Sequence, residues 1–437
     1  MKFLSVAVAP LLLSLPPLAR AQTLPPIPID SARHAFAEAH ALCSADGGRL
    51  WGVSLCGPIM FVDAPSRSIV ASEGDANGVL AAKEGAFVGV LPANQNVANT
   101  AVEWSGVRWT QMLWPIPSDE RLRATLMAHE LFHRIQSQLG FPNHSAGENA
   151  HLDELNGRYY MQLEWRALAR ALEAGSDADR RSAARDALVF RAERYRIYPK
   201  AAAEEYGLEQ NEGLAEYTGV RVGNPTAELQ TKMALRDLSA HVGDATFVRS
   251  FAYATGPAYG LLLDRYAPGW HARLRAGEGF DAILGRALHV AGSGSREQLA
   301  AKRAAKYDGA TLHAAEVDRD AKRQQLLALN RAKFVSGPIL TLKFRKMNVQ
   351  FDPRNLQPLG DAGTVYPTIR VSDEWGVIEG KNGALMKPDW SALVVAAPLS
   401  TTGTHIVGDG WTLELRPGWK IVPDARAGDF VLSPPPS

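Results

Sequence analysis

The stretch MAHELFHRIQ, residues 127–136, places two histidines four positions apart, with a glutamate directly after the first. On an α-helix, residues i and i+4 lie one above the other, so His129 and His133 can direct two imidazoles at one point. Glu130 would lie on the adjoining face, where a carboxylate can take a proton from a metal-activated water. The pattern therefore predicts a zinc site with His129 and His133 as ligands and Glu130 as the general base.

The residues around this motif are typical of a buried helix. Ser118 is a candidate N-cap, Asp119 follows in the first turn, and Gly140 is a candidate stop. Apolar residues occur on most sides of the expected helix, which indicates little exposure to water. The alternative is a buried helix that carries the motif by chance. Because buried histidines and carboxylates are costly without partners, the metal site is favoured.

The first 21 residues have the features of a secretory signal peptide. Lys2 provides a positive start, an apolar run extends to Leu18, and Ala19-Arg20-Ala21 is a small-x-small cleavage site. The short length and the prolines within the run disfavour a retained membrane anchor. We therefore expect a secreted or periplasmic bacterial protein with no membrane anchor after cleavage.

The 437-residue chain carries 47 Lys and Arg against 46 Asp and Glu, a formal net charge of +1. So balanced a chain has no electrostatic attraction for nucleic acid or for an anionic membrane, and neither is expected as a partner. The length exceeds one compact core and predicts two or three subdomains.

Cys43 and Cys56 are the two cysteines of the chain. In an oxidising compartment two cysteines this close are expected to form a structural disulfide, worth about 3 kcal/mol on the chain-entropy model. A thiol nucleophile or a metal-binding pair is the alternative. Neither cysteine lies in a Cys-x-x-Cys pattern, which favours the disulfide.

The residue pattern changes twice along the chain and predicts an α+β fold in three parts after residues 1–21. Residues 22–117 form a strand-rich lobe, expected to be antiparallel, that contains the disulfide. Residues 118–334 have helical periodicity and carry the metal motif, and a basic run at 180–196, interleaved with acids, is expected to be a solvated helix face. Residues 335–437 return to short, turn-bounded strands and predict a β-rich module.

A catalytic zinc site needs a third protein ligand, and the best source is LEQNEGLAEYTG at residues 208–219. Asn211-Glu212-Gly213 followed by Ala215 resembles the Asn-Glu-Gly-x-Ala segment of the aminopeptidase N family, which belongs to the gluzincin metallopeptidases. In that family the glutamate is the third zinc ligand. The resemblance therefore implies a zincin-like catalytic core with Glu212 as the third ligand.

The same resemblance implies a role for Glu216, one helical turn after Glu212. Thermolysin-like relatives place a carboxylate four residues after the ligand glutamate, where it orients a zinc-bound histidine. Ligating histidines usually donate their second N–H to such a group. The chain departs from these families in having Glu instead of Asp at this position. It also has a much longer segment between His133 and Glu212, with two expected helices at residues 155–196.

This long segment leaves other third ligands open. The alternatives are Glu216, Glu154 or Asp153, and His151 or His144 as a third histidine. Glu154 lacks the Asn-Glu-Gly context. Charged residues at helix starts are also usually caps or solvated acids, so Glu212 is favoured.

Peptide hydrolysis also needs a hydrogen-bond donor for the oxyanion of the tetrahedral intermediate. Tyr253-x-x-Gly256 in FAYATGPAYGLLLDRY resembles the Tyr-x-x-Gly segment of the aminopeptidase N family, whose tyrosine is that donor. The resemblance implies Tyr253 as a catalytic residue. Tyr259 is an alternative donor, and an ordinary core tyrosine is the other interpretation.

These features together predict a zinc metallopeptidase of the gluzincin type, with Zn²⁺ as cofactor and a peptide or protein as substrate. The strand around residues 105–114 is expected at a sheet edge, where an extended substrate could pair with it. Two alternatives stay open. One is another zinc-dependent amide or ester hydrolase, and the other is a non-catalytic scaffold or binding protein with a vestigial zinc helix.

Overall fold

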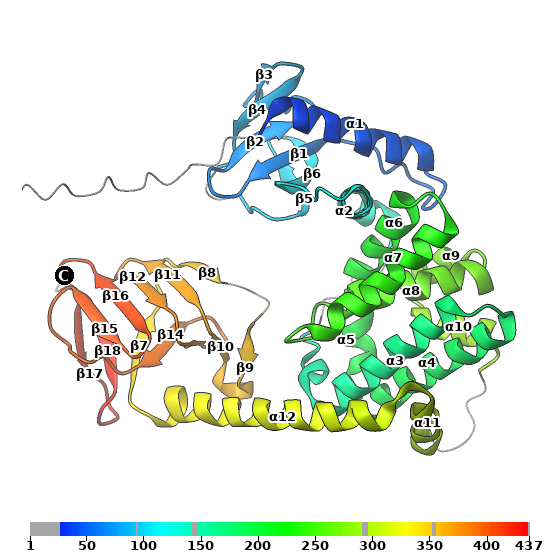
Figure 1. The fold of residues 1–437 in the computed structure, drawn as a ribbon. Helices are drawn as coiled ribbons and strands as arrows, with labels where there is room; N and C mark the ends of the chain where they lie inside the picture. Colours follow the sequence, from blue (N-terminus) through cyan, green and yellow to red (C-terminus); the bar gives the residue numbers. More distant parts are fainter. Residues whose placement is uncertain (1–26, 93–94, 142–146, 291–295, 352–354, 436–437) are drawn as a thin grey trace, which may run out of the picture. The chain divides into compact units, whose positions relative to one another are not determined.

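The computed structural model describes five stretches of the chain, residues 27–92, 95–141, 147–290, 296–351 and 355–435. The expected signal peptide and His144 lie outside them. The described residues combine helices and strands, which confirms the α+β class (Figure 1). They form two compact units, one from the described residues up to Glu38 and Pro58–Ile116, the other from Ala39–Gly57 and the described residues from Pro117 onward.

The first unit contains a six-stranded sheet and the start of helix α1 (Ile29–Asp46). In spatial order the strands are β3 (Ala81–Lys83), β4 (Ala86–Val90), β2 (Ser68–Ala71), β1 (Ile59–Asp63), β6 (Val107–Trp114) and β5 (Thr100–Trp104). Phe36 of α1 stacks on Phe61 of β1, with ring centroids 5.0 Å apart. Because β1 pairs antiparallel with β2 but parallel with β6, the sheet is mixed, and the prediction of an antiparallel sheet was wrong.

Strand β6 is an interior strand, so the prediction of a sheet edge at residues 105–114 was also wrong. It pairs with β1 on one side and with β5 on the other. Its backbone N–H and C=O groups are therefore used within the sheet, and a peptide cannot add to it. The edge strands of this sheet are β3 and β5.

The second unit contains most of the helices of the chain. They are the end of α1 and α2 (Glu120–Gln136), α3 (Leu155–Glu173), α4 (Asp177–Ile197), α5 (Ala201–Leu208), α6 (Leu214–Gly223), α7 (Ala227–Ala240), α8 (Phe251–Tyr266), α9 (Trp270–Arg275), α10 (Phe280–Ala287), α11 (Arg296–Ala304) and α12 (Gly309–Arg331). The two helices expected at residues 155–196 are α3 and α4. A π-helical turn, η3 (Glu209–Gly213), joins α5 to α6, and α6 packs against both α2 and α8.

Helix α2 begins at Glu120 because Asp119 caps its first turn. The Asp119 carboxylate accepts hydrogen bonds of 2.9 Å from the backbone N–H groups of Arg121 and Leu122. The cap is therefore one residue later than the predicted Ser118. Both residue types suit an N-cap, and the extended backbone at Asp119 places the cap there. After Gln136 the helix tightens into a 3₁₀ turn that ends at Gly140, whose φ of 70° is left-handed.

Beyond α12 the chain forms two sheets that share one apolar core, which includes Leu342, Trp375 and Leu413. The seven-stranded sheet has the order β17-β18-β7-β14-β13-β10-β9 and the five-stranded sheet the order β15-β16-β12-β11-β8. Their bounds are β7 (Ile339–Lys343), β8 (Asn348–Phe351), β9 (Gln357–Pro358), β10 (Thr364–Tyr366), β11 (Ile369–Asp373), β12 (Gly376–Gly380), β13 (Ala384–Met386), β14 (Ala392–Ala396), β15 (His405–Gly408), β16 (Trp411–Leu415), β17 (Lys420–Pro423) and β18 (Phe430–Ser433). Leu327 of α12 packs beside this module, against a small cluster that includes Phe334 and Val394.

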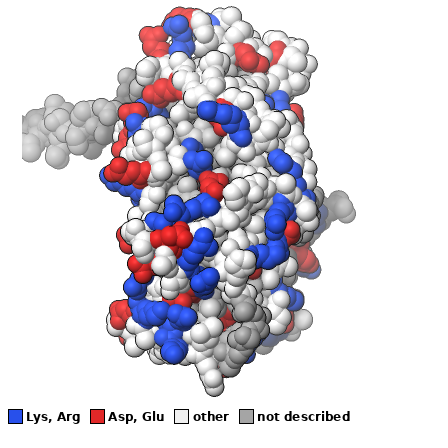
Figure 2. Space-filling model, turned by 90° about the vertical axis from the view of Figure 1, so that its right-hand side faces the viewer, with Lys and Arg blue, Asp and Glu red and all other residues white. Residues whose placement is uncertain are grey.

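Charged side chains of both signs are interspersed on the face drawn in Figure 2. Among the described helices, none combines the length and the apolar composition that crossing a membrane requires.

Candidate metal centre

The two histidines of α2 and a glutamate of η3 converge on one point. Nε2 of His129 and Nε2 of His133 lie 3.1 Å apart. Oε2 of Glu212 lies 3.7 Å from the first nitrogen and 3.5 Å from the second. A point equidistant from these three atoms lies about 2.0 Å from each, which matches zinc–nitrogen and zinc–oxygen bond lengths. The spacing of the three donor atoms therefore suits one metal ion.

Hydrogen bonds on the outer side of each ring determine which nitrogen carries the proton. Nδ1–H of His129 donates to Oε2 of Glu216 at 2.7 Å. Nδ1–H of His133 donates to Oε1 of Gln136 at 3.0 Å. The Gln136 amide is oriented in turn, because its Nε2 donates to the carbonyl of Gln210 at 3.0 Å. With Nδ1 protonated, the lone pair of Nε2 in the neutral form of each ring faces the shared point.

Three electron pairs that face one another repel unless a cation lies between them. A proton on His129 is one such cation. Burial alone lowers the pKa of His129, but its hydrogen bonds with Glu212 and Glu216 outweigh burial and raise the pKa to about 10. Two imidazole nitrogens and one carboxylate form a ligand set of known catalytic zinc sites. The residues present therefore fit a divalent metal ion.

Glu130 lies beside this point without joining the three donor atoms. Its Oε1 is 4.0 Å from Nε2 of His129, and the ligand atoms of His129, Glu130 and His133 all lie within 4.8 Å of one another. The Glu130 side chain is only 4% exposed, and its Oε2 has no hydrogen-bond partner among the described residues. Burial raises the pKa of this carboxyl. Such a group is suited to take up and hold a proton.

Two glycines explain how Glu212 meets Tyr253. A Cβ on Gly256 of α8 would lie 2.1 Å from the carbonyl oxygen of Gly213, so the two backbones touch and leave no room for a side chain. Tyr253 lies one turn before Gly256, and its hydroxyl donates to Oε2 of Glu212 at 2.7 Å. Gly256 of the Tyr-x-x-Gly segment is therefore needed where α8 meets η3, and a Cβ on Gly213 would be a tight fit, 3.2 Å from the carbonyl oxygen of Ala252.

Tyr253 also stacks on one of the two histidines of α2. Its ring is parallel to that of His129, with centroids 5.7 Å apart. Burial and the nearby Glu212 carboxylate raise the pKa of Tyr253 well above its usual value, so the hydroxyl keeps its proton. The alternative donor, Tyr259, lies elsewhere. It is fully buried and donates to Glu164 at 2.7 Å.

The other candidate ligands have different partners. Nε2 of His151 lies 2.8 Å from a carboxylate oxygen of Glu205. Glu154 interacts with Tyr198 and Asp153 with Thr246, and neither belongs to the group that gathers around His129 and His133. Glu216 contacts the outer nitrogen of a histidine, on the side away from the shared point. Among the described residues, the carboxylate that lies within 3.7 Å of both Nε2 atoms is that of Glu212, in the Asn-Glu-Gly segment.

A buried network of charges, which the sequence did not reveal, holds the start of η3. Arg191 of α4 donates two hydrogen bonds to the oxygens of Glu209, at 2.6 and 3.1 Å, and one of 2.7 Å to Glu164 of α3. Arg194 donates two hydrogen bonds of 2.7 Å to Glu205 and one of 2.7 Å to Glu164. The prediction of a solvated face was therefore wrong for these two arginines, which are fully buried. Ion pairs from α4, supported by Glu164 of α3, therefore fix the position of Glu205 and Glu209, at the end of α5 and the start of η3.

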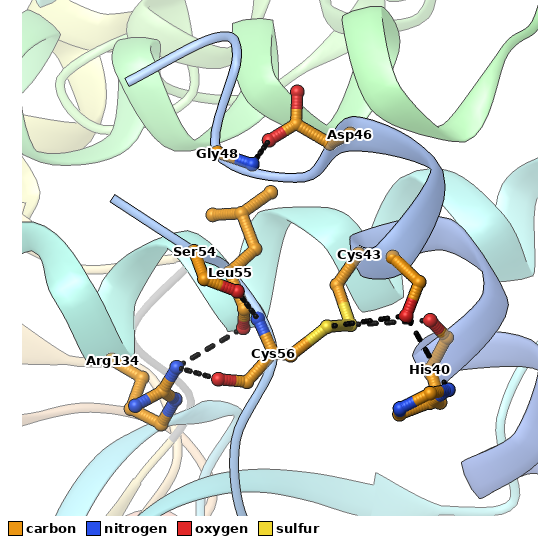
Figure 3. Close-up of a disulfide and its surroundings, with 9 residues drawn as sticks. His40, Cys43, Asp46, Gly48, Ser54, Leu55, Cys56 and Arg134 are labelled. Atoms are coloured by element: carbon orange, nitrogen blue, oxygen red, sulfur yellow. Dashed lines mark hydrogen bonds between the residues drawn. A yellow bond between two sulfur atoms is a disulfide. The ribbon is translucent and has the colours of Figure 1, made fainter. Parts of the chain in front are cut away.

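The disulfide predicted between Cys43 and Cys56 is confirmed, with Cα atoms 5.1 Å apart. It lies next to α2, the helix that carries His129 and His133 (Figure 3). Arg134, the residue after His133, donates to the carbonyls of Leu55 at 3.1 Å and Cys56 at 2.6 Å. A Cβ on Gly57 would collide with this guanidinium, so Gly57 provides the space that it occupies. The disulfide-bonded segment is thus tied to the end of α2.

Compared with models of known protein families, with curated proteins and with solved structures, the chain matches none of them. The interpretation of the site therefore rests on its own residues.

Proposed function

We propose that this protein is a zinc-dependent peptidase of the gluzincin type, built on a zincin-like core, with Glu130 as its general base. The observation that carries the proposal is the spacing of three donor atoms, from His129, His133 and Glu212, which lie at zinc-bond distance from one point. The motif resemblances at residues 211–215 and 253–256 support the same assignment.

His129, His133 and Glu212 would hold the ion and leave a fourth position open, as in catalytic zinc sites. When bound, zinc supplies a Lewis acid that lowers the pKa of a water and polarises a carbonyl. Zinc is favoured over magnesium or calcium because two of the three donors are imidazole nitrogens, whereas those ions prefer oxygen.

The remaining groups have roles that follow from their contacts. Glu130 offers a buried oxygen without a partner among the described residues, so it can take a proton from the attacking water and deliver it to the leaving amine. Tyr253 keeps its proton and can donate to the oxyanion instead of to Glu212. Glu216 holds the ring of His129 in the orientation that directs Nε2 inward.

The proposal includes a secreted or periplasmic location, with a peptide or protein as the substrate. A disulfide is typical of an oxidising compartment, which supports this location. The balanced charge of the chain, 47 Lys and Arg against 46 Asp and Glu, agrees with a substrate that is not a nucleic acid.

The proposal is tested by measuring zinc content and cleavage of an unstructured protein, such as reduced and alkylated casein. We expect one zinc per chain, loss of cleavage on chelation and recovery on adding zinc. Glu130→Gln should bind zinc without cleaving, whereas Glu228→Gln, at an exposed position of α7, should behave as wild type. Cleavage that survives chelation would overturn the proposal. Hydrolysis of activated esters alone would point to the other hydrolase class, and tight zinc binding without any hydrolysis to a scaffold.

A further inference from the structure

Gln136, the last residue of α2, uses both ends of its amide. Its Oε1 accepts the Nδ1–H of His133, three residues earlier, at 3.0 Å. Its Nε2 donates to the backbone carbonyls of Gln210 at 3.0 Å and Asn211 at 3.4 Å. Both carbonyls belong to η3, directly before Glu212. One side chain therefore contacts a candidate ligand on α2 and the backbone that carries another.

The amide has one orientation that satisfies all these contacts. If it were turned over, Oε1 would face two carbonyl oxygens and repel them. The amino group would then face Nδ1 of His133, which would have to accept a hydrogen bond and leave its proton on Nε2. That proton would point at the shared point and block it. The two carbonyls of η3 thus determine, through Gln136, which nitrogen of His133 is free.

We propose that Gln136 is a positioning residue that couples the two halves of the metal centre, α2 and η3. It sets the tautomer and the rotation of the His133 ring. It also fixes the position of η3 relative to α2, so that Oε2 of Glu212 lies 3.5 Å from Nε2 of His133. The inference rests on the metal-binding part of the proposed function and not on peptide cleavage.

Gln136 and Glu216 divide this task differently. Glu216 comes from α6 and contacts His129 through a single hydrogen bond. Gln136 comes from α2 itself and reaches across to η3. Gln210 extends the connection, because its side-chain Nε2 donates to the hydroxyl of Tyr206 in α5 at 2.8 Å. A shift of η3 would therefore move the amide of Gln136 and change the orientation of His133. A rotation of His133 would likewise disturb the hydrogen bonds between Gln136 and η3.

Two substitutions separate the two ends of the amide. Gln136→Met is close in shape and removes both the acceptor and the donor. Gln136→Glu keeps an acceptor for His133 and adds a negative charge near the metal, but it loses the donor to the η3 carbonyls. Gln138→Met and Gln138→Glu are matched controls, because Gln138 lies two residues further on and is exposed.

The probe is zinc alone, with affinity measured by competition against a chromophoric chelator. Cobalt absorption spectra report the geometry of the site, and the thermal midpoint of the metal-free protein reports stability. We expect Gln136→Met to weaken zinc binding by ~10–100-fold, the range for residues that orient metal ligands. Gln136→Glu should also bind more weakly than wild type, despite its favourable charge, and the cobalt spectrum of both variants should change. Both controls should match wild type.

Three results would overturn the inference. Gln136→Met with wild-type affinity would show that Gln136 positions nothing. Gln136→Glu with affinity equal to or above wild type would show that it serves His133 alone. A lowered metal-free midpoint with an unchanged cobalt spectrum would mean a purely structural role. A wild-type protein that binds zinc but cleaves no peptide would contradict the peptidase proposal without affecting this inference. Failure of the peptidase proposal can therefore be distinguished from failure of the inference about Gln136.

Discussion

Oε2 of Glu216 accepts a hydrogen bond of 2.7 Å from Nδ1 of His129, although 87 positions separate the two residues in the sequence. The approach of α6 to α2 makes this contact. A Cβ on Gly219 would lie 2.6 Å from the carbonyl oxygen of Thr125, and one on Gly223 would lie 2.7 Å from its backbone nitrogen. Two glycines one turn apart let the helices touch at Thr125, one turn before His129.

Glu212→Ala and Glu216→Ala should differ in degree. Removing Glu212 deletes one of three donors, so tight zinc binding should be lost. Removing Glu216 frees the ring of His129 but leaves all three donors, and affinity or activity should fall by ~10–100-fold. Calorimetric titration with zinc measures both variants. Equal losses would contradict the separate roles assigned to the two carboxylates.

Glu130→Gln should retain zinc and lose hydrolysis. The amide is nearly isosteric but cannot accept the proton of the water, so turnover should fall by at least ~10²–10⁴-fold, the contribution of general-base catalysis. Turnover of an unstructured protein substrate and zinc content are measured on the same preparation. Near-wild-type turnover would exclude Glu130 as the base.

Gly219→Ala should weaken the metal centre from a distance. Its Cβ meets a backbone oxygen that cannot turn away, so α6 must move from α2, at a cost of roughly 1–3 kcal/mol in stability, as for other overpacked sites. Zinc affinity should fall with it, because Glu216 moves away from His129. Gly175→Ala, with no atom within 4 Å of the added Cβ, is the control and should unfold as wild type does. Unchanged zinc affinity in Gly219→Ala would contradict this coupling.

Stability should fall in mild acid partly because of His271. Burial lowers the pKa of this histidine to about 4, with Arg275 and Arg221 acting in the same direction and Asp264 against it. Between about pH 6.5 and 4 the unfolded chain binds a proton that the folded chain does not, so the free energy of unfolding decreases as pH falls. Because His271 is partly exposed, we discount the full shift and expect an effect of about 1 kcal/mol.

Urea unfolding of wild type and His271→Phe at pH 7.5 and 4.5 measures this effect. The loss of stability on acidification should be smaller in the variant, since its side chain takes up no proton. His313→Phe, at an exposed position of α12, serves as the control. An identical loss in wild type and His271→Phe would contradict the assignment.

Replacing both Cys43 and Cys56 by Ser should destabilise the second unit by about 3 kcal/mol, the chain-entropy value for a short loop. Zinc affinity should fall as well, because the carbonyls of Leu55 and Cys56 would no longer hold Arg134 beside His133. Guanidinium unfolding of the metal-free protein measures the first effect and chelator competition the second. A fall in stability with unchanged zinc affinity would show that the disulfide segment does not support the site.

Some of the fold and of the candidate site was determined by the sequence alone. The relation of His129, Glu130 and His133 is local, since a helix repeats every 3.6 residues and places these side chains without help from the rest of the chain. The disulfide was predictable because a short loop brings its two cysteines together at little entropic cost. Capping was predictable to within one residue, because Ser118 and Asp119 both suit the position and only the backbone selects between them.

Tertiary structure decided what depends on distant partners. Strand β6 was expected at a sheet edge, because the residue pattern of a strand indicates which side chains are buried but not which strands lie beside it. In the structure it pairs with both β1 and β5 and is therefore an interior strand. Arg191 and Arg194 look like surface residues in the sequence. They are buried because Glu164, Glu205 and Glu209 arrive from other helices to pair with them. The motif resemblance singled out Glu212, but its place beside the two histidines depends on backbone contacts between Gly213 and Gly256 and between Gly219 and Thr125, which only the folded chain brings together.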